Sequence, residues 1–351
     1  LLTSTCDIFV AFPTSVLMSF IVVWNCISIC KMSKNFVYLA GMKWNMMGVH
    51  KSPSDRTSTH MAGTLKMVPR VRERFSGHCI GQRYVLGREL GSGSSATVYG
   101  AHDTHKDRQV AVKLLHRGSD NESGRWRFIC ERESLNRLAG SPHVVTLLDS
   151  GEEEDGQLFL VLERVHGVLL AELLSVHSKV RTKLRAETIL RWFGQLCLVM
   201  SSAHSAGVVH RDIKPSNIIL TRTDPEDILL IDFGVASTPD LPMESRQHWF
   251  GTQGYMSPEQ EAGTVDLTAT TDVYSIGLVL LEMLTTGLKK PLQRTPLSVL
   301  VKLREWDYIA YLRKARKDCP ASLFDVLSRA LKRQPDERFP SADSLLAALS
   351  L

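Results

Sequence analysis

The sequence VHRDIKPSN at residues 209–217 places a carboxylate, an ammonium group and a carboxamide at short, fixed spacing. These groups belong to Asp212, Lys214 and Asn217, and the segment follows a stretch of helical periodicity that ends near Gly207. Phosphoryl transfer needs a carboxylate that orients the attacking hydroxyl and accepts its proton. It also needs an ammonium group that neutralises the moving charge and an oxygen ligand for Mg²⁺. A solvated polar loop would rarely supply all three, so the segment predicts a phosphoryl-transfer site with Asp212 as base, Lys214 as charge stabiliser and Asn217 as metal ligand.

A second carboxylate follows this loop at the end of an apolar run. In the sequence LIDFG at residues 230–234, Asp232 ends a predicted strand. Because Mg²⁺ prefers oxygen ligands, we expect Asp232 and Asn217 to hold the ion together. An Asp-Phe-Gly triplet alone is uninformative, and its position after the loop gives it meaning.

A Gly/Ser-rich segment lies between the first two of three strands predicted at residues 84–90, 97–101 and 109–115. Small residues let the backbone fold over phosphates and offer N–H groups to their oxygens. Taken alone, such a segment is more commonly a hairpin turn, and Ala96 stands where a third glycine is often found. We expect these residues to cover the phosphates of a nucleotide: Leu90, Gly91, Ser92, Gly93, Ser94, Ser95, Ala96, Thr97 and Val98.

One lysine, Lys113, ends the apolar strand pattern VAVK at residues 110–113. A strand lysine usually extends from an edge into solvent. The functional interpretation has Lys113 pairing with phosphates while a helix carboxylate holds it. In the helix predicted at residues 124–138, Glu131 is the expected partner because it lies four residues before Leu135, and Glu133 is the alternative.

In their order along the chain, these segments resemble the signature series of the protein kinases. The series also includes His210 and Arg211 before Asp212, and the sequence SPE at residues 257–259. The sequences GTQGYMSPEQ at residues 251–260 and DVYSIG at residues 272–277 are similar to those of the bacterial eukaryotic-like (Hanks-type) serine/threonine kinases. The resemblance covers about 270 residues, and so many motifs do not fall in order by chance.

The resemblance implies a two-lobed α+β fold, a small β-rich N-lobe over a helical C-lobe, with ATP and Mg²⁺ or Mn²⁺ between them. It implies that Leu162 is the gatekeeper beside adenine. Glu163 and Val165 would offer backbone groups to the base, while Ala111 and Val98 would pack on its faces. Ordinary strand packing would also explain these residues.

Serine/threonine specificity is implied by Lys214 and by Thr252, which in this family bonds to the catalytic Asp and Lys. The resemblance further implies a buried ion pair between Glu259 and Arg338, a structural role for His210, protein substrates, and dimerisation for autophosphorylation. Arg211 would bind a phosphate on the segment between Asp232 and Glu259, or else a partner such as Glu244. The candidate hydroxyls there are Ser237, Thr238 and Ser245.

Two other functions compete with a protein kinase. A pseudokinase scaffold would normally lack Lys113, Asp212, Asn217 or Asp232, and all four are present. A small-molecule phosphotransferase such as an aminoglycoside kinase would lack the segment at residues 251–259, which builds a ledge for peptides. A protein substrate is therefore favoured.

The first 82 residues differ from the rest of the chain. Residues 8–30 contain no charged residue and are long enough to cross a hydrocarbon core of roughly 30 Å. Lysines follow this segment, and the positive-inside rule then places the catalytic domain in the cytoplasm. The chain starts Leu-Leu, so translated upstream sequence is the competing interpretation of residues 1–60. We expect an anchor or upstream sequence at 1–50, a basic Ser/Thr-rich linker at 51–82 and a kinase domain at 83–351.

Charge and cysteine content narrow the function further. The net charge of +5 over 351 residues is too small and too dispersed to indicate nucleic acid, and seven scattered cysteines fit a reducing compartment. Basic residues towards the C-terminus favour acidic partners, although a solvated helix face is the commoner explanation. They are Lys289, Lys290, Arg294, Lys302, Arg304, Arg313, Lys314, Arg316 and Lys317.

Overall fold

The computed structural model describes residues 38–39, 42–43, 77–93, 95–116, 122–221, 227–238, 251–289, 301 and 307–349. The chain divides into two compact units, Leu1–Lys66 and Met67–Leu351. In the first unit, β1 (Tyr38–Leu39) and β2 (Met42–Lys43) pair as an antiparallel hairpin. The predicted anchor at residues 8–30 and most of the linker lie outside the described residues. Within the described ranges, no helix is long and apolar enough to span a bilayer.

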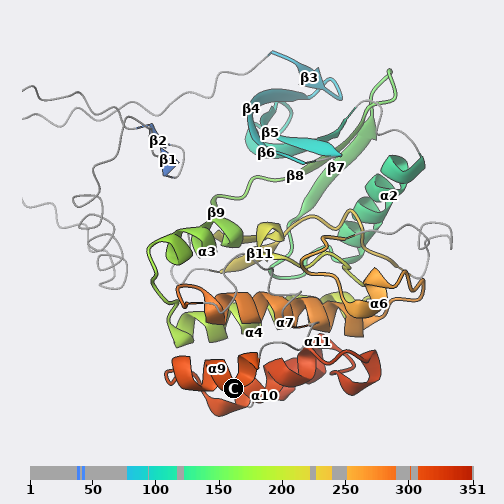
Figure 1. The fold of residues 1–351 in the computed structure, drawn as a ribbon. Coiled ribbons are helices and arrows are strands. Elements are labelled where there is room, and N and C mark those ends of the chain that lie inside the picture. The colour runs from blue at the N-terminus through green and yellow to red at the C-terminus, as the bar shows by residue number, and fades with distance from the viewer. Residues whose placement is uncertain are drawn as a thin grey trace, which may run out of the picture. The chain divides into compact units, whose positions relative to one another are not determined.

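The second unit begins with an antiparallel six-stranded sheet, labelled in the upper part of Figure 1. The strands follow the order β3-β4-β5-β6-β8-β7. The three predicted strands are present and slightly longer than expected. The bounds are β3 (Cys79–Ile80), β4 (Tyr84–Ser92), β5 (Ala96–Asp103), β6 (Arg108–Leu115), β7 (Leu147–Glu152) and β8 (Leu158–Glu163).

Successive side chains of β6 point to opposite faces of the sheet and join two different hydrophobic clusters. Val110, Val112 and Leu114 join one hydrophobic cluster, while Ala111 between them belongs to the core shared with the helical lobe. Because successive strand residues point to opposite faces, Lys113 lies on the same face as Ala111. The register places Val98 opposite Lys113.

Helix α2 (Glu122–Arg137) covers this inner face and matches the predicted helix. Phe128 anchors it in a cluster with Leu115, Leu158 and Leu160 from the sheet. Burial of these apolar side chains fixes the helix against the strands. Glu131, three residues after Phe128, then faces the sheet.

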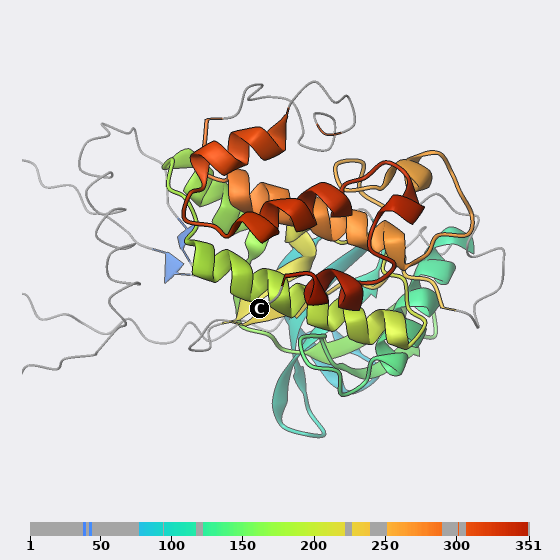
Figure 2. The ribbon, with the colours of Figure 1, turned by 90° about the horizontal axis from the view of Figure 1, so that it is seen from below.

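The remaining elements form the helical lobe, and Figure 2 shows its long helices from below. Helix α4 ends as predicted, because Gly207 adopts φ +74° and its N–H bonds to His204 O at 3.0 Å. Helix α7 is buried along almost its whole length, which explains its apolar sequence. The helices are α3 (Leu170–Lys179), α4 (Ala186–Ser205), α6 (Pro258–Glu261), α7 (Ala269–Thr285), α9 (Tyr308–Ala315), α10 (Ala321–Ala330) and α11 (Ala342–Ala347).

A small sheet of order β11-β10-β9 positions the loop at residues 209–217. The strands are β9 (Gly167–Leu169), β10 (Ile218–Thr221) and β11 (Ile228–Leu230). The loop therefore runs from α4 into β10, and Asp232 follows β11. The loop that carries Asp212, Lys214 and Asn217 enters this small sheet, and Asp232 follows its neighbouring strand.

The predicted ion pair between Glu259 and Arg338 is present. Arg338 Nη1 and Nη2 lie 2.7 and 2.8 Å from the two carboxylate oxygens, and the arginine side chain is fully buried. Its guanidinium also donates to the carbonyl groups of Lys332, Arg333 and Thr270. This pair ties α6 to the C-terminal part of the lobe.

One expectation is wrong: Arg316 does not belong to a solvated basic face. Its side chain is fully buried and donates to Leu184 O at 2.8 Å and Leu284 O at 3.1 Å, while also pairing with Asp318. A guanidinium with five donors can satisfy several backbone carbonyls at once, which a sequence pattern does not reveal. Lys290, Arg294, Lys302 and Arg304 lie outside the described residues.

The Glu259–Arg338 pair gives a stability test. We expect Arg338→Met to lower the free energy of unfolding by about 3–5 kcal/mol, because it leaves a mostly buried carboxylate and three carbonyls unpaired. The matched control is Arg313→Met, whose exposed pair with Asp325 should contribute at most about 1 kcal/mol. Urea denaturation would measure both. Equal losses in the two variants would contradict the assignment.

Candidate active site

A buried carboxylate, Asp272, holds the loop at residues 209–217 in place. From the first turn of α7 it accepts hydrogen bonds from the backbone N–H groups of His210 and Arg211, both at 2.8 Å. His204 Nε2 donates to it at 3.0 Å. Burial alone would raise the pKa of Asp272, but these hydrogen bonds and the two histidines lower it. No role was assigned to Asp272 from the sequence, although an acid in the first turn of a largely apolar helix is a usable signal.

The loop brings the three predicted groups together. Lys214 Nζ lies 2.6 Å from Asp212 Oδ2 and 2.6 Å from Thr252 Oγ1. Asn217 Nδ2 donates to the Asp212 carbonyl at 2.9 Å. Asp212 Oδ1 is buried and accepts no hydrogen bond from the residues that the structure describes. One oxygen of this carboxylate is thus fixed by the protein, and the other is left for a further donor.

His210 supports this loop from beneath. It is fully buried, its ring centroid lies 4.6 Å from that of Phe233, and its Nδ1 accepts the Asp212 N–H at 3.3 Å. Burial lowers the pKa of His210, so the ring is neutral. A neutral, buried imidazole agrees with the structural role expected for it.

Lys113 lies between two carboxylates. Its Nζ is 2.8 and 2.7 Å from the oxygens of Glu131 and 2.8 Å from Asp232 Oδ1. Burial would lower the pKa of Lys113, but the two carboxylates raise it overall. Glu133 instead pairs with its neighbour Arg132 at the surface. The structure therefore places Glu131, and not Glu133, against the lysine.

With all three groups ionised, Lys113, Glu131 and Asp232 carry a net charge of −1. The pKa values of the two acids shift in opposite directions. The ammonium group lowers the pKa of Asp232, whose side chain is 43% exposed. Desolvation raises the pKa of Glu131, which is 3% exposed, to about 7. Asp232 is therefore the carboxylate that stays ionised and open to solvent.

Asp232 lies beside Asn217 because Ile231 N donates to Asn217 O at 2.9 Å. Asp232 has φ +66°, a left-handed backbone that is unusual for a residue with a side chain. A Cβ on Gly234 would lie 3.2 Å from Asp232 Oδ1 and 3.3 Å from Glu131 Oε2. This close approach explains the glycine after Phe233.

The β4–β5 hairpin lies at the other side of Lys113. A Cβ on Gly91 would meet nothing within 4 Å, and one on Gly93 only Ala96 O at 3.8 Å. Neither glycine has a positive φ. Neither packing nor backbone conformation therefore requires glycine at these two positions. The Thr97 hydroxyl bonds to Ser92 and His116 and so fastens the hairpin. Ser94 lies outside the described residues.

The residues expected around adenine come from neighbouring strands. Ala111 and Leu162 are buried and directly opposed in the β6–β8 pair. Glu163 ends β8, and its N–H donates to Thr146 O at 2.9 Å. Val165 follows two residues later and packs against the core. The four residues thus line the junction between the lobes.

Three further contacts around the loop at residues 209–217 were not predicted from the sequence. Gln260 Nε2 donates to Arg211 O at 2.7 Å, and Gln260 also forms a capping box with Ser257. The Ser-x-x-Gln pattern at residues 257–260 is a recognisable helix start that would have located α6. The His204 ring adds a link to α11, because its Nδ1 accepts the Ala342 N–H at 3.3 Å.

Arg211 was expected to bind a phosphate, and in this structure it contacts backbone carbonyl groups. The guanidinium donates to the carbonyl groups of Val235 and Ala236. Thr238 is only 2% exposed, and Ser237 is paired through its backbone with Val209. Ser245 and Glu244 lie outside the described residues. In this conformation the Thr238 hydroxyl is closed to a phosphoryl donor.

Comparison with known proteins agrees with this geometry. Residues 84–348 match the family described as the protein kinase domain. The chain is 35% identical over 288 residues to the serine/threonine-protein kinase PknD of Mycobacterium tuberculosis, covering 80% of this chain and 40% of PknD. A probable serine/threonine-protein kinase of Clostridium acetobutylicum is 34% identical over 278 residues, with coverages of 78% and 40%. The chain thus spans about two fifths of the length of these curated relatives.

A solved structure shares the fold. The crystal structure of the PknI kinase domain of Mycobacterium tuberculosis has a TM-score of 0.56 and 28% sequence identity. The match covers 79% of this chain and 96% of that domain.

The raised pKa of Glu131 predicts a pH dependence of stability. Between its ordinary value of 4.5 and about 7, the folded chain binds the proton on this residue more tightly than the unfolded chain does. The contribution of Glu131 to the free energy of unfolding therefore falls as pH rises through this window. We expect Glu131→Gln to flatten this slope in urea denaturation, while the surface control Glu133→Gln keeps it. Parallel curves for wild type and Glu131→Gln would contradict the assignment.

Proposed function

Because the chain belongs to the protein kinase family, we propose that it transfers the γ-phosphate of ATP to serine or threonine hydroxyls of proteins. One observation carries the proposal most directly. Asp212 holds one oxygen on Lys214 and keeps the other, Oδ1, buried without a partner in the described part of the chain. A buried carboxylate oxygen is stable only when it meets a donor, and a substrate hydroxyl is such a donor.

In the proposed reaction, the hydroxyl oxygen of the substrate forms a bond to the γ-phosphorus. The bond from that phosphorus to the β–γ bridging oxygen breaks, and ADP leaves with the electron pair. Asp212 orients the hydroxyl and accepts its proton, while Lys214 neutralises charge on the transferring group. Thr252 keeps Lys214 in position through its hydrogen bond.

The hairpin and the inner face of the sheet fit a nucleotide. The open space around Gly91 and Gly93 leaves their backbone accessible to phosphate oxygens. Lys113, held by Glu131, would pair with the phosphates. Ala111, Val98 and Leu162 would pack on adenine, whose edge would meet backbone groups of Glu163 and Val165.

Asn217 and Asp232 fit a divalent cation, with Mg²⁺ the proposed ion and Mn²⁺ an alternative of similar chemistry. The lowered pKa of Asp232 keeps its carboxylate ionised, and Asn217 Nδ2 is turned towards Asp212 O. The carboxamide oxygen then remains for the ion, and hard cations prefer such oxygens. When bound, the ion would offset charge on the nucleotide phosphates.

The role of Asp212 can be tested with purified residues 67–351 and radiolabelled ATP. We expect Asp212→Ala to lower kcat by at least about 10²-fold, since the general base is lost, while ATP binding persists. Asp325→Ala, at an exposed surface pair, is the matched control and should retain full activity. Robust labelling of a generic basic protein by Asp212→Ala would refute the assignment.

We further propose that residues 8–30 anchor the chain in a membrane, with the kinase domain on the cytoplasmic side. The uncharged segment and the lysines after it support this orientation. We expect the full chain to pellet with membranes and resist carbonate extraction, whereas a chain starting at Met61 stays in the supernatant. Native protein found only in the supernatant, without peptides from before Met46, would instead favour an upstream sequence that is not expressed.

A further inference from the structure

The tip of the β4–β5 hairpin is held from the face of the sheet opposite to Lys113, which we call the outer face. Ser92 and Thr97 are directly paired across the hairpin, and Thr97 is in turn paired with Leu114 of β6. Directly paired residues point to the same face of a sheet. Leu114 packs on the outer face in the cluster that also holds Val112. Ser92 and Thr97 therefore lie behind the hairpin, while the nucleotide is proposed for the face of Lys113.

Three polar side chains form a hydrogen-bonded chain on this outer face. Thr97 Oγ1 lies 2.9 Å from Ser92 Oγ and 2.8 Å from His116 Nε2. Thr97 is 8% exposed, so its hydroxyl needs partners within the protein. We call Ser92, Thr97 and His116 the hairpin clip. The clip connects β4, β5 and the residue that directly follows β6.

The backbone of His116 contacts the same hairpin. His116 N donates to Ser95 O at 2.9 Å, and Gly93 N closes the turn by donating to Ala96 O at 2.9 Å. His116 therefore meets the hairpin twice, once through its main chain and once through its ring. Because it lies three residues after Lys113, it links the hairpin to the strand that carries the phosphate-binding lysine.

The hairpin needs such a restraint because its own pairing is irregular. The pairing of β4 with β5 shifts register twice, between Leu86 and Glu89 and between Glu89 and Gly91. Gly91 and Gly93 contribute no side-chain packing, and glycine loses more conformational freedom than any other residue when it is ordered. Beyond the two register shifts, the clip fixes which residues face each other at the tip.

Hydrogen bonding explains why an imidazole suits the third position of the clip. The Thr97 hydroxyl has one proton, so it can donate to one neighbour while it accepts from the other. Nε2 of a neutral histidine takes either role, depending on the tautomer, and the Ser92 hydroxyl takes the complementary role. The chain of hydrogen bonds is therefore complete with either tautomer of His116. A glutamine amide can also donate or accept, whereas a leucine side chain can do neither.

We propose that His116 is a positioning residue for the nucleotide phosphates and acts through Thr97 and Ser92. The inference rests on the proposed function, in which backbone N–H groups of the hairpin meet those phosphates. By holding the register of the tip, the clip orders these N–H groups before the nucleotide arrives. Less conformational entropy is then lost on binding, which raises the affinity. Because the clip lies on the outer face, its side chains need not touch the nucleotide.

The test compares binding of ATP with Mg²⁺ and binding of adenosine to the full chain, both by isothermal titration calorimetry. Adenosine carries the same base but has no phosphates for the hairpin to meet. We expect His116→Leu and Thr97→Val to weaken ATP binding about three- to tenfold, the effect of one lost hydrogen bond. Adenosine binding should not change. The double variant should bind ATP no more weakly than either single one, because both changes break the same chain.

Two conservative variants separate hydrogen bonding from side-chain shape. His116→Gln and Thr97→Ser keep groups that donate and accept hydrogen bonds, so both should retain the ATP affinity of the wild type. A loss in these two variants as large as that in His116→Leu and Thr97→Val would show that the hydrogen bonds are not the cause. That result would overturn the inference.

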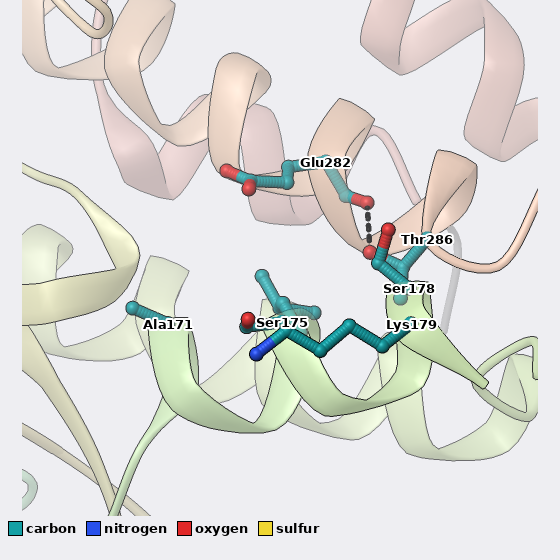
Figure 3. A pocket seen from close by; sticks show the side chains of 7 residues that line it. Ala171, Ser175, Ser178, Lys179, Glu282 and Thr286 are labelled. Atoms are coloured by element: carbon teal, nitrogen blue, oxygen red, sulfur yellow. Dashed lines mark hydrogen bonds between the residues drawn. The ribbon is translucent and has the colours of Figure 1, made fainter. Parts of the chain in front are cut away.

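Matched controls lie away from the hairpin. Thr286 is buried like Thr97, and its hydroxyl donates to Glu282 O at 2.7 Å. Figure 3 shows this bond at the wall of a hollow of about 370 Å³ between α3 and α7. The residues that line the hollow belong to α3, to α7 or to the position after α7, so none comes from the hairpin. Thr286→Val, and His105→Leu at the exposed turn between β5 and β6, should leave binding of both ligands unchanged.

The outcomes separate this inference from the proposed function. If the clip only satisfies a buried hydroxyl, His116→Leu and Thr97→Val will lower the free energy of unfolding in urea without changing the ratio of ATP to adenosine affinity. That result would refute the inference, while phosphoryl transfer by the wild type would still support the proposed function. Weaker ATP binding in the clip variants, with no phosphoryl transfer by the wild type, would refute the proposed function alone. A wild type that binds no ATP would refute both.

Discussion

The arrangement of the candidate site depends on one buried carboxylate. Asp272 holds two consecutive backbone N–H groups of the loop at residues 209–217, and Arg211 between Asp212 and His210 adopts φ +64°. A left-handed conformation at a residue with a long side chain persists only where neighbouring contacts fix it. The acid sits in the most apolar of the helices that the structure describes, where an unpaired charge would be strongly disfavoured. The loop and the acid therefore stabilise one another, and the geometry of Asp212 follows from that mutual requirement.

Charge balance around Lys113 explains why the site fits phosphates and a cation together. Two carboxylates share one ammonium group, so the protein alone leaves one excess negative charge there. The excess is tolerated because the pKa of Glu131 rises while Asp232 stays ionised and partly exposed. A divalent cation on Asp232 would remove the excess and lower the pKa of Glu131 again. Binding of the ion would thus strengthen the ion pair that positions Lys113.

The sequence predicted what local spacing determines. Asp212, Lys214 and Asn217 lie within six residues, so one loop brings them together. Helix periodicity also separated Glu131 from Glu133. Contacts between segments distant in sequence could not be predicted from local spacing. Asp272 lies about 60 residues after the loop that it binds, and Arg316 donates to the carbonyl groups of Leu184 and Leu284. The pair of Glu259 and Arg338 was expected only because a family pattern supplied the long-range information.

Arg211 joins both described flanks of the segment between Asp232 and Glu259. Its guanidinium donates to carbonyl groups at Val235 and Ala236, and its own carbonyl accepts from Gln260. Gly251 approaches so closely that a Cβ would lie 3.2 Å from Arg211 O and 2.7 Å from Gln260 Nε2. A phosphate on Ser237 or Thr238 would have to displace carbonyl partners that are already well placed. Backbone contacts to Arg211 and the Gln260 cap therefore contribute to the order of these flanks.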